Sequence, residues 1–151
     1  MALLMWLPAC KRVPAVVRNT VPGASGESKL DLRVDVAQQA NNNNPIAVDL
    51  VLVSDKKLLK ELLKLSAAEW FEKRHQFRLD YPKETGLNAG SWEWVPGQVV
   101  RLDRMTVKLE ISGGIIFARY FTPGTHRAHI DPRKNLRLIL EAEDFTVETL
   151  K

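Results

Sequence analysis

Two histidines and three acidic residues have the side-chain types that metal or acid–base chemistry requires. His126 and His129 are three residues apart in a segment with the pattern of a strand, so their side chains point to opposite faces, and no third ligand is near them in the sequence. No spacing brings the three acids together: Asp80, Glu84 and Glu93. The sequence therefore predicts neither a metal site nor a pair of catalytic carboxylates.

Nucleophiles and phosphate-binding loops give the same result. No nucleophile elbow surrounds the serines at positions 54, 66, 91 and 112. The pair Gly113-Gly114 lies between two predicted strands rather than before a helix, so we interpret it as a hairpin turn. We therefore expect a protein that is not an enzyme, needs no cofactor and takes no small-molecule substrate.

Two tryptophans, Trp92 and Trp94, share one face of a predicted strand at 91–95. Such a pair can form a platform for carbohydrate or for a protein partner, or it can pack in the core beneath a helix. The usual burial of large aromatic side chains favours the core, and the platform remains the alternative.

Cys10 is the single cysteine, so the chain can form neither an intramolecular disulfide nor a cysteine-based zinc site. An apolar run at 1–7, too short to span a bilayer, is followed by Pro8-Ala9 and then the cysteine. A small residue before a cysteine at the end of an apolar run is the pattern of a bacterial lipoprotein signal. We predict that 1–9 is the remnant of a signal peptide, shortened by a missed upstream start, and that Cys10 is acylated, for example with palmitate. A lone cysteine in an unordered N-terminus is the alternative.

Residues 10–28 contain prolines and glycines among small and polar residues, which predicts a tether ahead of a single domain at 29–151. A chain of 151 residues is long enough for a core without disulfides. The net charge of +4 comes from basic residues scattered among acids, so nucleic-acid binding is not expected.

Two strands open the predicted domain. Residues 30–36 alternate between apolar and charged side chains, whereas 46–53 are apolar on both faces, as expected of a strand covered on both sides. Asp49 is the exception in the second strand, and its carboxylate needs solvent or a cationic neighbour. Between the strands lies a polar segment with Asn41, Asn42, Asn43 and Asn44, which we interpret as an exposed turn because asparagine tolerates left-handed backbone geometry.

A helical insertion is predicted at about 55–78, with caps at Asp55 and at Ser66, which forms a capping box with Glu69. After a polar loop at 83–90, short strands separated by turns fill the rest of the chain: 91–95, 98–102, 105–111, 115–121, 126–130, 136–141 and 145–150. The prediction is a mainly β protein, an antiparallel β-sandwich with a helical insertion after the second strand.

This order of features resembles the outer-membrane lipoprotein of bacterial type VI secretion systems, the TssJ/SciN family, of which the chain would be a divergent member. The matching features span most of the chain after the cysteine: Cys10, the strands at 30–36 and 46–53, the polar turn ending at Pro45, Trp70-Phe71, Pro96-Gly97 and the segment 115–120. The asparagine run and the longer, lysine-rich helical region depart from the family pattern. The resemblance implies a transthyretin-like sandwich held by a short tether to an acylated cysteine.

The resemblance also implies a structural role in a secretion complex. The family lipoprotein sits on the periplasmic face of the outer membrane and binds the periplasmic part of an inner-membrane component, TssM. Much of that contact comes from the loop between the first two strands, which here corresponds to Gln38, Gln39, Asn41, Asn42, Asn43 and Asn44. Lys11 follows Cys10 where an aspartate commonly retains a lipoprotein in the inner membrane, so the outer membrane is implied.

A ligand carrier or periplasmic chaperone of similar build is the alternative function. It would use the face of Trp92 and Trp94 or a pocket between sheet and helix. A deep apolar cavity would favour the carrier, whereas a filled core with a projecting loop at 38–44 would favour the anchoring role.

Overall fold

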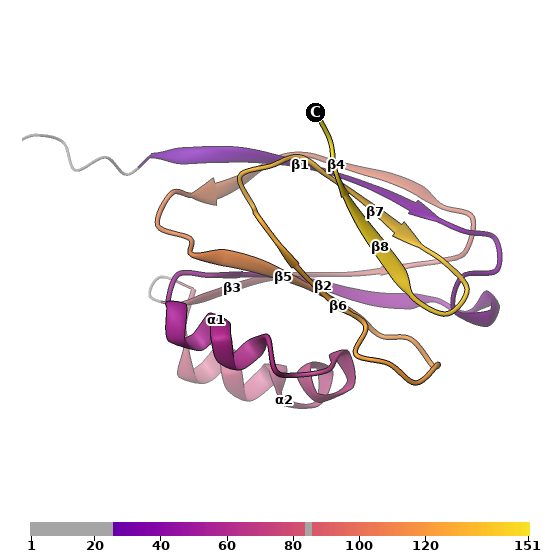
Figure 1. Cartoon of the computed structure of the whole chain (residues 1–151), viewed down its shortest axis with the longest axis horizontal. Helices are drawn as coiled ribbons and strands as arrows, with labels where there is room; N and C mark the ends of the chain where they lie inside the picture. The colour runs from indigo at the N-terminus through magenta and orange to yellow at the C-terminus, as the bar shows by residue number, and fades with distance from the viewer. Residues whose placement is uncertain (1–25, 84–85) are drawn as a thin grey trace, which may run out of the picture.

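The structure is a computed structural model that describes residues 26–83 and 86–151 (Figure 1). Eight strands, two α-helices and one short 3₁₀ helix follow one another in this part of the chain. Their bounds are β1 (Glu27–Val36), η1 (Ala40–Asn43), β2 (Ile46–Val53), α1 (Lys56–Leu62), α2 (Ala67–Asp80), β3 (Leu87–Trp94), β4 (Val99–Lys108), β5 (Gly113–Ala118), β6 (Arg127–Ile130), β7 (Leu136–Leu140) and β8 (Phe145–Thr149).

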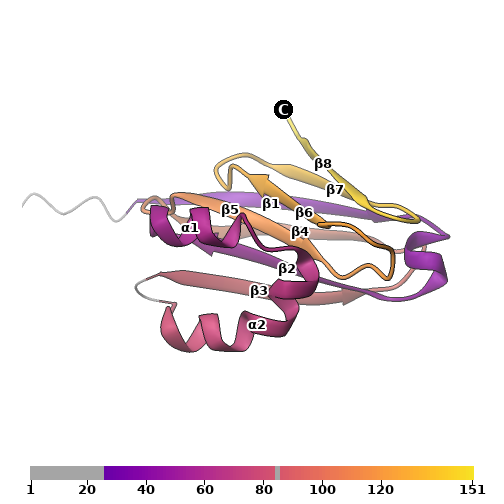
Figure 2. The ribbon, with the colours of Figure 1, turned by 60° about the horizontal axis from the view of Figure 1, so that its bottom comes forward.

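The strands form two four-stranded sheets, with the orders β4-β1-β7-β8 and β3-β2-β5-β6. The sheets lie face to face, and both helices cover the outer face of the β3-β2-β5-β6 sheet (Figures 1 and 2). The predicted mainly β sandwich with a helical insertion after the second strand is therefore confirmed. One pair departs from the antiparallel prediction, because β1 and β7 run parallel. A long crossover through the second sheet separates these two strands, and such a connection permits a parallel pair.

The first two strands build the core as their patterns predict. In β1 the inward residues Leu30, Leu32 and Val34 are at most 2% exposed. Strand β2 faces two cores at once, with Ile46 and Leu50 among its side chains between the sheets and Val51 and Val53 packed beneath the helices. This two-sided burial explains why β2 is apolar on both faces.

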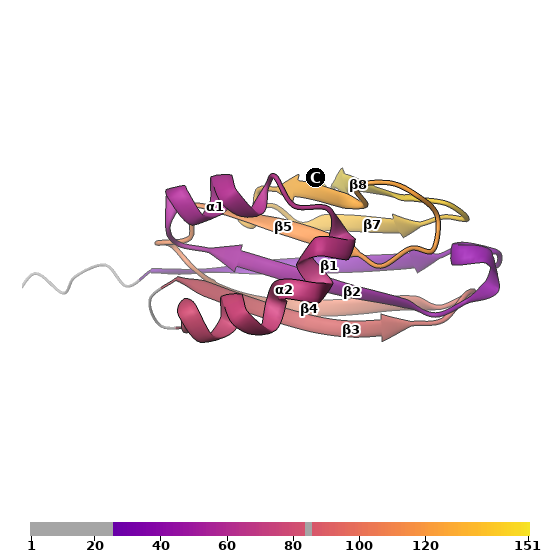
Figure 3. The same cartoon turned by 90° about the horizontal axis from the view of Figure 1, so that it is seen from below.

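The helical insertion is two helices with the predicted caps. The Asp55 carboxylate accepts hydrogen bonds from the backbone N–H groups of Lys57 and Leu58, and the Ser66–Glu69 capping box is formed at the start of α2. The hydrogen bonds from Ser66 lower the pKa of Glu69. Figure 3 shows both helices lying along the sheet in this view from below.

Asp49 is fully buried on the helix-facing side of β2, so of the two expected alternatives, solvent or a cationic neighbour, the cationic neighbour is present. The Arg74 guanidinium donates to both carboxylate oxygens at 3.1 and 3.0 Å, and Trp70 Nε1 donates to Oδ2 at 2.9 Å. Arg78 Nη2 lies 3.6 Å from the same Oδ2. Strand β2 and helix α2 are therefore joined by a buried polar network whose carboxylate is satisfied.

The predicted boundaries of β3 and β4 are wrong. Strand β3 begins at Leu87, inside the predicted loop 83–90, because residues 87–90 continue the ladder with β2. The predicted strands 98–102 and 105–111 are one strand, β4, which a bulge interrupts at the left-handed residue Arg104 (φ 55°). Asp31 stabilises the bulge, since its Oδ1 accepts a 2.7 Å hydrogen bond from the Arg104 N–H.

The glycine pair predicted as a turn, Gly113-Gly114, lies inside strand β5. A Cβ on Gly113 would lie 2.8 Å from Leu59 Cδ2, and one on Gly114 would lie 2.9 Å from Ile130 Cγ1. Neighbouring side chains thus pack directly against the strand at both glycines, and any larger residue would have to displace them.

The two tryptophans of β3 are core residues, as the sequence favours, but they do not lie beneath a helix. They pair with β2 residues of the inter-sheet face and stack on each other, with ring centroids 5.8 Å apart. Trp94 is 5% exposed and Trp92 is partly buried. The helices cover the opposite face of this sheet, so the prediction that the two tryptophans pack beneath a helix is wrong.

The predicted division at residues 28 and 29 falls within a strand, because β1 already begins at Glu27. Cys10, the remnant at 1–9 and the tether up to residue 25 lie outside the described residues. Within the described part, neither helix is long and apolar enough to cross a membrane.

Candidate functional site

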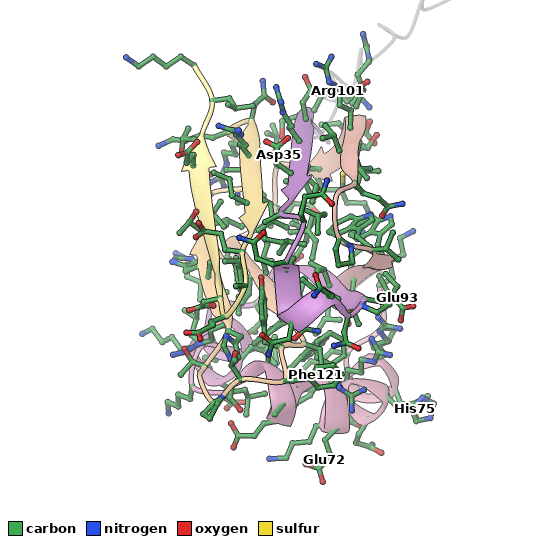
Figure 4. All side chains as sticks on the ribbon, turned by 90° about the vertical axis from the view of Figure 1, so that its right-hand side faces the viewer. Asp35, Glu72, His75, Glu93, Arg101 and Phe121 are labelled. Carbon is green, nitrogen blue, oxygen red and sulfur yellow. The ribbon has the colours of Figure 1, made fainter. Side chains whose placement is uncertain are left out.

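Four connections meet at one end of the sandwich, which we call the loop end: residues 38–44 between β1 and β2, 95–98 between β3 and β4, 119–126 between β5 and β6, and 141–144 between β7 and β8. Strand β1 starts at the other end, so the chain enters the domain away from the loop end (Figure 1). The connections touch directly, since the Asn41 N–H donates to the Glu141 carbonyl at 3.3 Å. Figure 4 views the molecule from this end, with Phe121 beside the η1 turn.

The residues predicted to bind a partner divide into two groups. Gln38, Gln39, Asn42 and Asn43 are exposed, and Asn44 is partly exposed, so these side chains are available to a partner. Asn41 is 0% exposed, so the expectation of an exposed turn is wrong at this position. Three consecutive asparagines, 41 to 43, have φ values of 49°, 53° and 62°. The left-handed backbone that these asparagines were predicted to tolerate is therefore present.

Asn41 holds the loop end together with its side chain. Its Nδ2 donates to the Pro45 carbonyl at 3.1 Å, and its Oδ1 accepts from the Phe121 N–H at 2.9 Å. The second bond joins the β1–β2 connection to the β5–β6 connection. Asn41 thus fixes the position of Phe121 relative to the exposed glutamines and asparagines.

The β5–β6 connection is also fixed from the β7–β8 side. Tyr120 Oη donates to the Asp144 carbonyl at 2.8 Å, and Thr122 Oγ1 donates to the Glu143 carbonyl at 2.6 Å. Burial raises the pKa of Tyr120, which therefore remains a neutral hydrogen-bond donor. The connections of the loop end are therefore joined to one another by hydrogen bonds rather than independent.

His126, one of the histidines considered as a metal ligand, is buried in this connection. Its Nδ1 lies 2.9 Å from Asp144 Oδ1 and its Nε2 lies 2.8 Å from the Thr122 carbonyl oxygen. Both ring nitrogens thus face protein oxygens, and His129 is exposed on β6. In residues 26–83 and 86–151, no three His, Cys, Asp or Glu side chains are placed to hold a metal ion.

Asp35 lies near the end of β1 and forms ion pairs with two arginines, Arg33 and Arg137. Burial raises the pKa of Asp35, but the hydrogen bonds and charges of Arg137 and Arg33 outweigh this effect and lower it. Figure 4 shows Asp35 and Arg101 on the β4-β1-β7-β8 side and Glu72 and His75 on the helix side of this view.

A groove of about 560 Å³ adjoins the loop end, between the start of α2 and the β5–β6 connection. Phe71, Arg119 and Phe121 line it, and the Phe121 side chain is 70% exposed. The sequence prediction missed these residues because it placed Phe121 inside a strand at 115–121. The available signal was the turn that follows directly, Thr122-Pro123-Gly124-Thr125, which ends the strand and leaves the aromatic ring at its edge.

Comparison with solved structures identifies similar folds. The lipoprotein TssJ1 of the Pseudomonas aeruginosa type VI secretion system superposes with a TM-score of 0.65 at 13% identity, over 83% of this chain and 98% of that one. Lip of Serratia marcescens, described as a membrane-bound component of the type VI secretion system, gives 0.56 at 13% identity, over 82% and 98%.

A third similar chain comes from a structure described as the C-terminal domain of the type VI secretion protein TssM from EAEC. It superposes with a TM-score of 0.55 at 12% identity, over 82% of this chain and 98% of that one. No protein-family model and no curated protein matches the sequence. The resemblance stated from the sequence is thus confirmed in three dimensions: this chain has the fold of the type VI secretion lipoproteins over most of its length.

Proposed function

We propose that this chain is a non-catalytic lipoprotein of a type VI secretion membrane complex. Acylated Cys10 would hold it on the periplasmic face of the outer membrane, and the loop end would bind the periplasmic part of an inner-membrane component of the TssM type. The observation that carries the proposal is the position of the exposed residues Gln38, Gln39, Asn42 and Asn43, at the end of the sandwich away from the start of β1. In this arrangement a lipid-anchored domain presents its loop end to the periplasm.

The kinds of protein that share the fold support this proposal. The similar structures include lipoproteins of type VI secretion systems, one of them membrane-bound, and not enzymes. The structure described as the TssM C-terminal domain contains a chain of the same fold, which supports a partner of this type. The carrier or chaperone alternative loses its predicted platform, because Trp92 and Trp94 pack between the sheets.

Membrane anchoring is tested by replacing Cys10 with serine in the full-length protein. We expect the wild-type protein to fractionate with outer membranes and Cys10→Ser to appear in the soluble periplasmic fraction, because serine cannot carry the thioether-linked lipid. Metabolic labelling with palmitate should follow the same pattern. Unchanged membrane fractionation together with unchanged secretion in the Cys10→Ser strain would contradict the anchoring role.

The partner site is tested by changing exposed loop residues and leaving Asn41 intact. In the quadruple variant Gln38→Ala, Gln39→Ala, Asn42→Gly and Asn43→Gly, the glycines preserve the left-handed backbone. We expect at least a tenfold weaker Kd for the purified periplasmic domain of the TssM protein of the same bacterium, because the polar contacts between the loop and the partner are lost. Equal affinity of both forms would show that the loop is not the binding site.

A matched control changes polar residues far from the loop end. Lys56→Ala and Lys60→Ala remove two exposed charges from α1, whose start lies toward the other end of the sandwich (Figure 1). This variant should bind the TssM domain as the wild type does. Each form is compared by isothermal titration calorimetry, with thermal unfolding to verify that the domain remains folded.

A further inference from the structure

The groove beside the loop end combines an apolar wall with a cation, Arg119, that forms no ion pair within residues 26–83 and 86–151. Phe71 of α2 and Phe121 of the β5–β6 connection line it together with Pro123, and Glu72 and Arg119 supply its charges. The Phe121 ring is 70% exposed, the highest exposed fraction among the large hydrophobic side chains of the described residues that face solvent. An aromatic side chain that is held out from the surface is typical of the anchor residues of protein interfaces.

The guanidinium groups of Arg74 and Arg119 both lie near the Phe71 ring, but they differ in their ion pairs. The Arg74 Cζ lies 4.8 Å from the ring centroid, and its guanidinium is paired with buried Asp49. The Arg119 Cζ lies 5.9 Å from the same centroid. Among the described residues, no carboxylate forms an ion pair with Arg119. Its exposed guanidinium, placed beside an aromatic ring, is thus ready to bind a carboxylate from outside the chain.

Hydrogen bonds tie the groove-lining segment 119–121 to the Asn41 side chain of the loop and to β2. The Asn41 side chain accepts the Phe121 N–H at 2.9 Å, and the Arg119 N–H donates to the Ala47 carbonyl in β2 at 2.8 Å. The positions of Phe121 and Arg119 are therefore fixed relative to the exposed residues Gln38, Gln39, Asn42 and Asn43. A partner seated on the loop can extend into the groove without any rearrangement of this domain.

We propose that the groove binds an extended segment of the periplasmic inner-membrane partner, which places an apolar side chain on Phe121 and a carboxylate on Arg119. This inference rests on the proposed function. The loop is polar and uncharged, and the groove adds an aromatic ring and a positive charge to it. The polar loop positions the partner segment along the groove, and the aromatic ring and the guanidinium supply a central hot spot. A second copy is the less suitable occupant, because two domains anchored in one membrane present their loop ends in the same direction.

The test compares three groove variants in the full-length chain carrying Cys10→Ser, which keeps the protein free of lipid. The probe is the purified periplasmic domain of the TssM protein of the same bacterium, titrated at 50 mM and 300 mM NaCl. Phe121→Ala should weaken binding by about tenfold, as loss of an exposed aromatic anchor does. Arg119→Ala should weaken binding and also reduce its salt dependence, whereas Arg119→Lys should retain the salt dependence. Leu79→Ala, at a 62% exposed apolar residue of α2, is the matched control with unchanged binding.

The outcomes separate this inference from the proposed function. Loss of binding in the quadruple loop variant with full binding by Phe121→Ala and Arg119→Ala would overturn the groove proposal and leave the partner site in place. Absence of binding by the wild-type chain would overturn both. Equal salt dependence of Arg119→Ala and the wild type would reject the carboxylate partner. If the groove variants alter self-association in sedimentation experiments and not TssM binding, the occupant is a second copy and the proposal is wrong.

Discussion

Replacement of Trp70 by alanine is expected to lower the free energy of unfolding by about 4 kcal/mol, a large part of the stability of a typical domain. Trp70 is 0% exposed and stacks on Phe117 of β5, with ring centroids 5.1 Å apart and an interplanar angle of 9°. Its Nε1 also donates to buried Asp49. The variant therefore loses the apolar contact between helix and sheet and also leaves the carboxylate with one donor fewer. Urea unfolding of the full-length chain measures the effect.

Trp70→Phe separates the two contributions, because phenylalanine keeps an aromatic ring against Phe117 and lacks the N–H. We expect this variant to cost about 1–3 kcal/mol, the penalty for a buried polar group that loses a partner. Leu79→Ala on the same helix serves as a surface control, since Leu79 is 62% exposed and should change stability little. If Trp70→Phe is as stable as the wild type, the N–H bond to Asp49 contributes nothing.

The features predicted correctly from the sequence are those encoded by nearby residues. The alternation in β1 and the capping box at Ser66 depend on spacings of two and three residues, and both are formed. The requirement of Asp49 for a cation was also readable, because a carboxylate in an apolar strand costs free energy unless it is paired. Which cation would serve was not readable, since Arg74 is 25 residues away and reaches β2 only when α2 packs on the sheet.

The features predicted wrongly depend on residues that meet only in the folded chain. Arg104 continues β4 through a bulge because Asp31, 73 residues away, accepts its N–H. Gly113 looks like a turn residue, but in the fold it makes room for Leu59. The same reason explains the candidate site. The asparagine run shows a tolerance for left-handed backbone, but only the packing shows that Asn41 turns inward while its neighbours face solvent.

This division within the asparagine run changes the physical picture of the interface. A polar loop alone offers hydrogen bonds that compete with water, and such contacts contribute little net free energy each. The loop end adds the exposed aromatic side chain of Phe121, whose backbone N–H donates to Asn41. An aromatic side chain has few rotatable bonds and loses little conformational entropy on binding, so its burial can supply a large part of the affinity. If both proposals hold, the loop supplies specificity and the connection beside it supplies most of the affinity.

Replacement of Asn41 by alanine is expected to lower the free energy of unfolding by about 3 kcal/mol, by two separate effects. The carbonyl of Pro45 and the N–H of Phe121 lose their hydrogen-bond partner, and alanine must adopt a φ of 49° that it disfavours. Because Phe121 is released, binding of the TssM domain should weaken even though the Asn41 side chain is buried. Urea unfolding and calorimetric titration of the same sample measure the two results.

Asn42 provides the matched control for Asn41, because its φ is 53° and its side chain is exposed. Asn42→Ala should therefore show only the backbone effect, about 1 kcal/mol. Asn41→Gly relieves the backbone effect and retains the loss of hydrogen bonds, so it should recover about that amount relative to Asn41→Ala. Equal stability of Asn41→Gly and the wild type would contradict the hydrogen-bonding role. If Asn41→Ala unfolds more readily but binds the TssM domain with full affinity, Phe121 does not depend on Asn41 for its position, and the loop and the groove are separate surfaces.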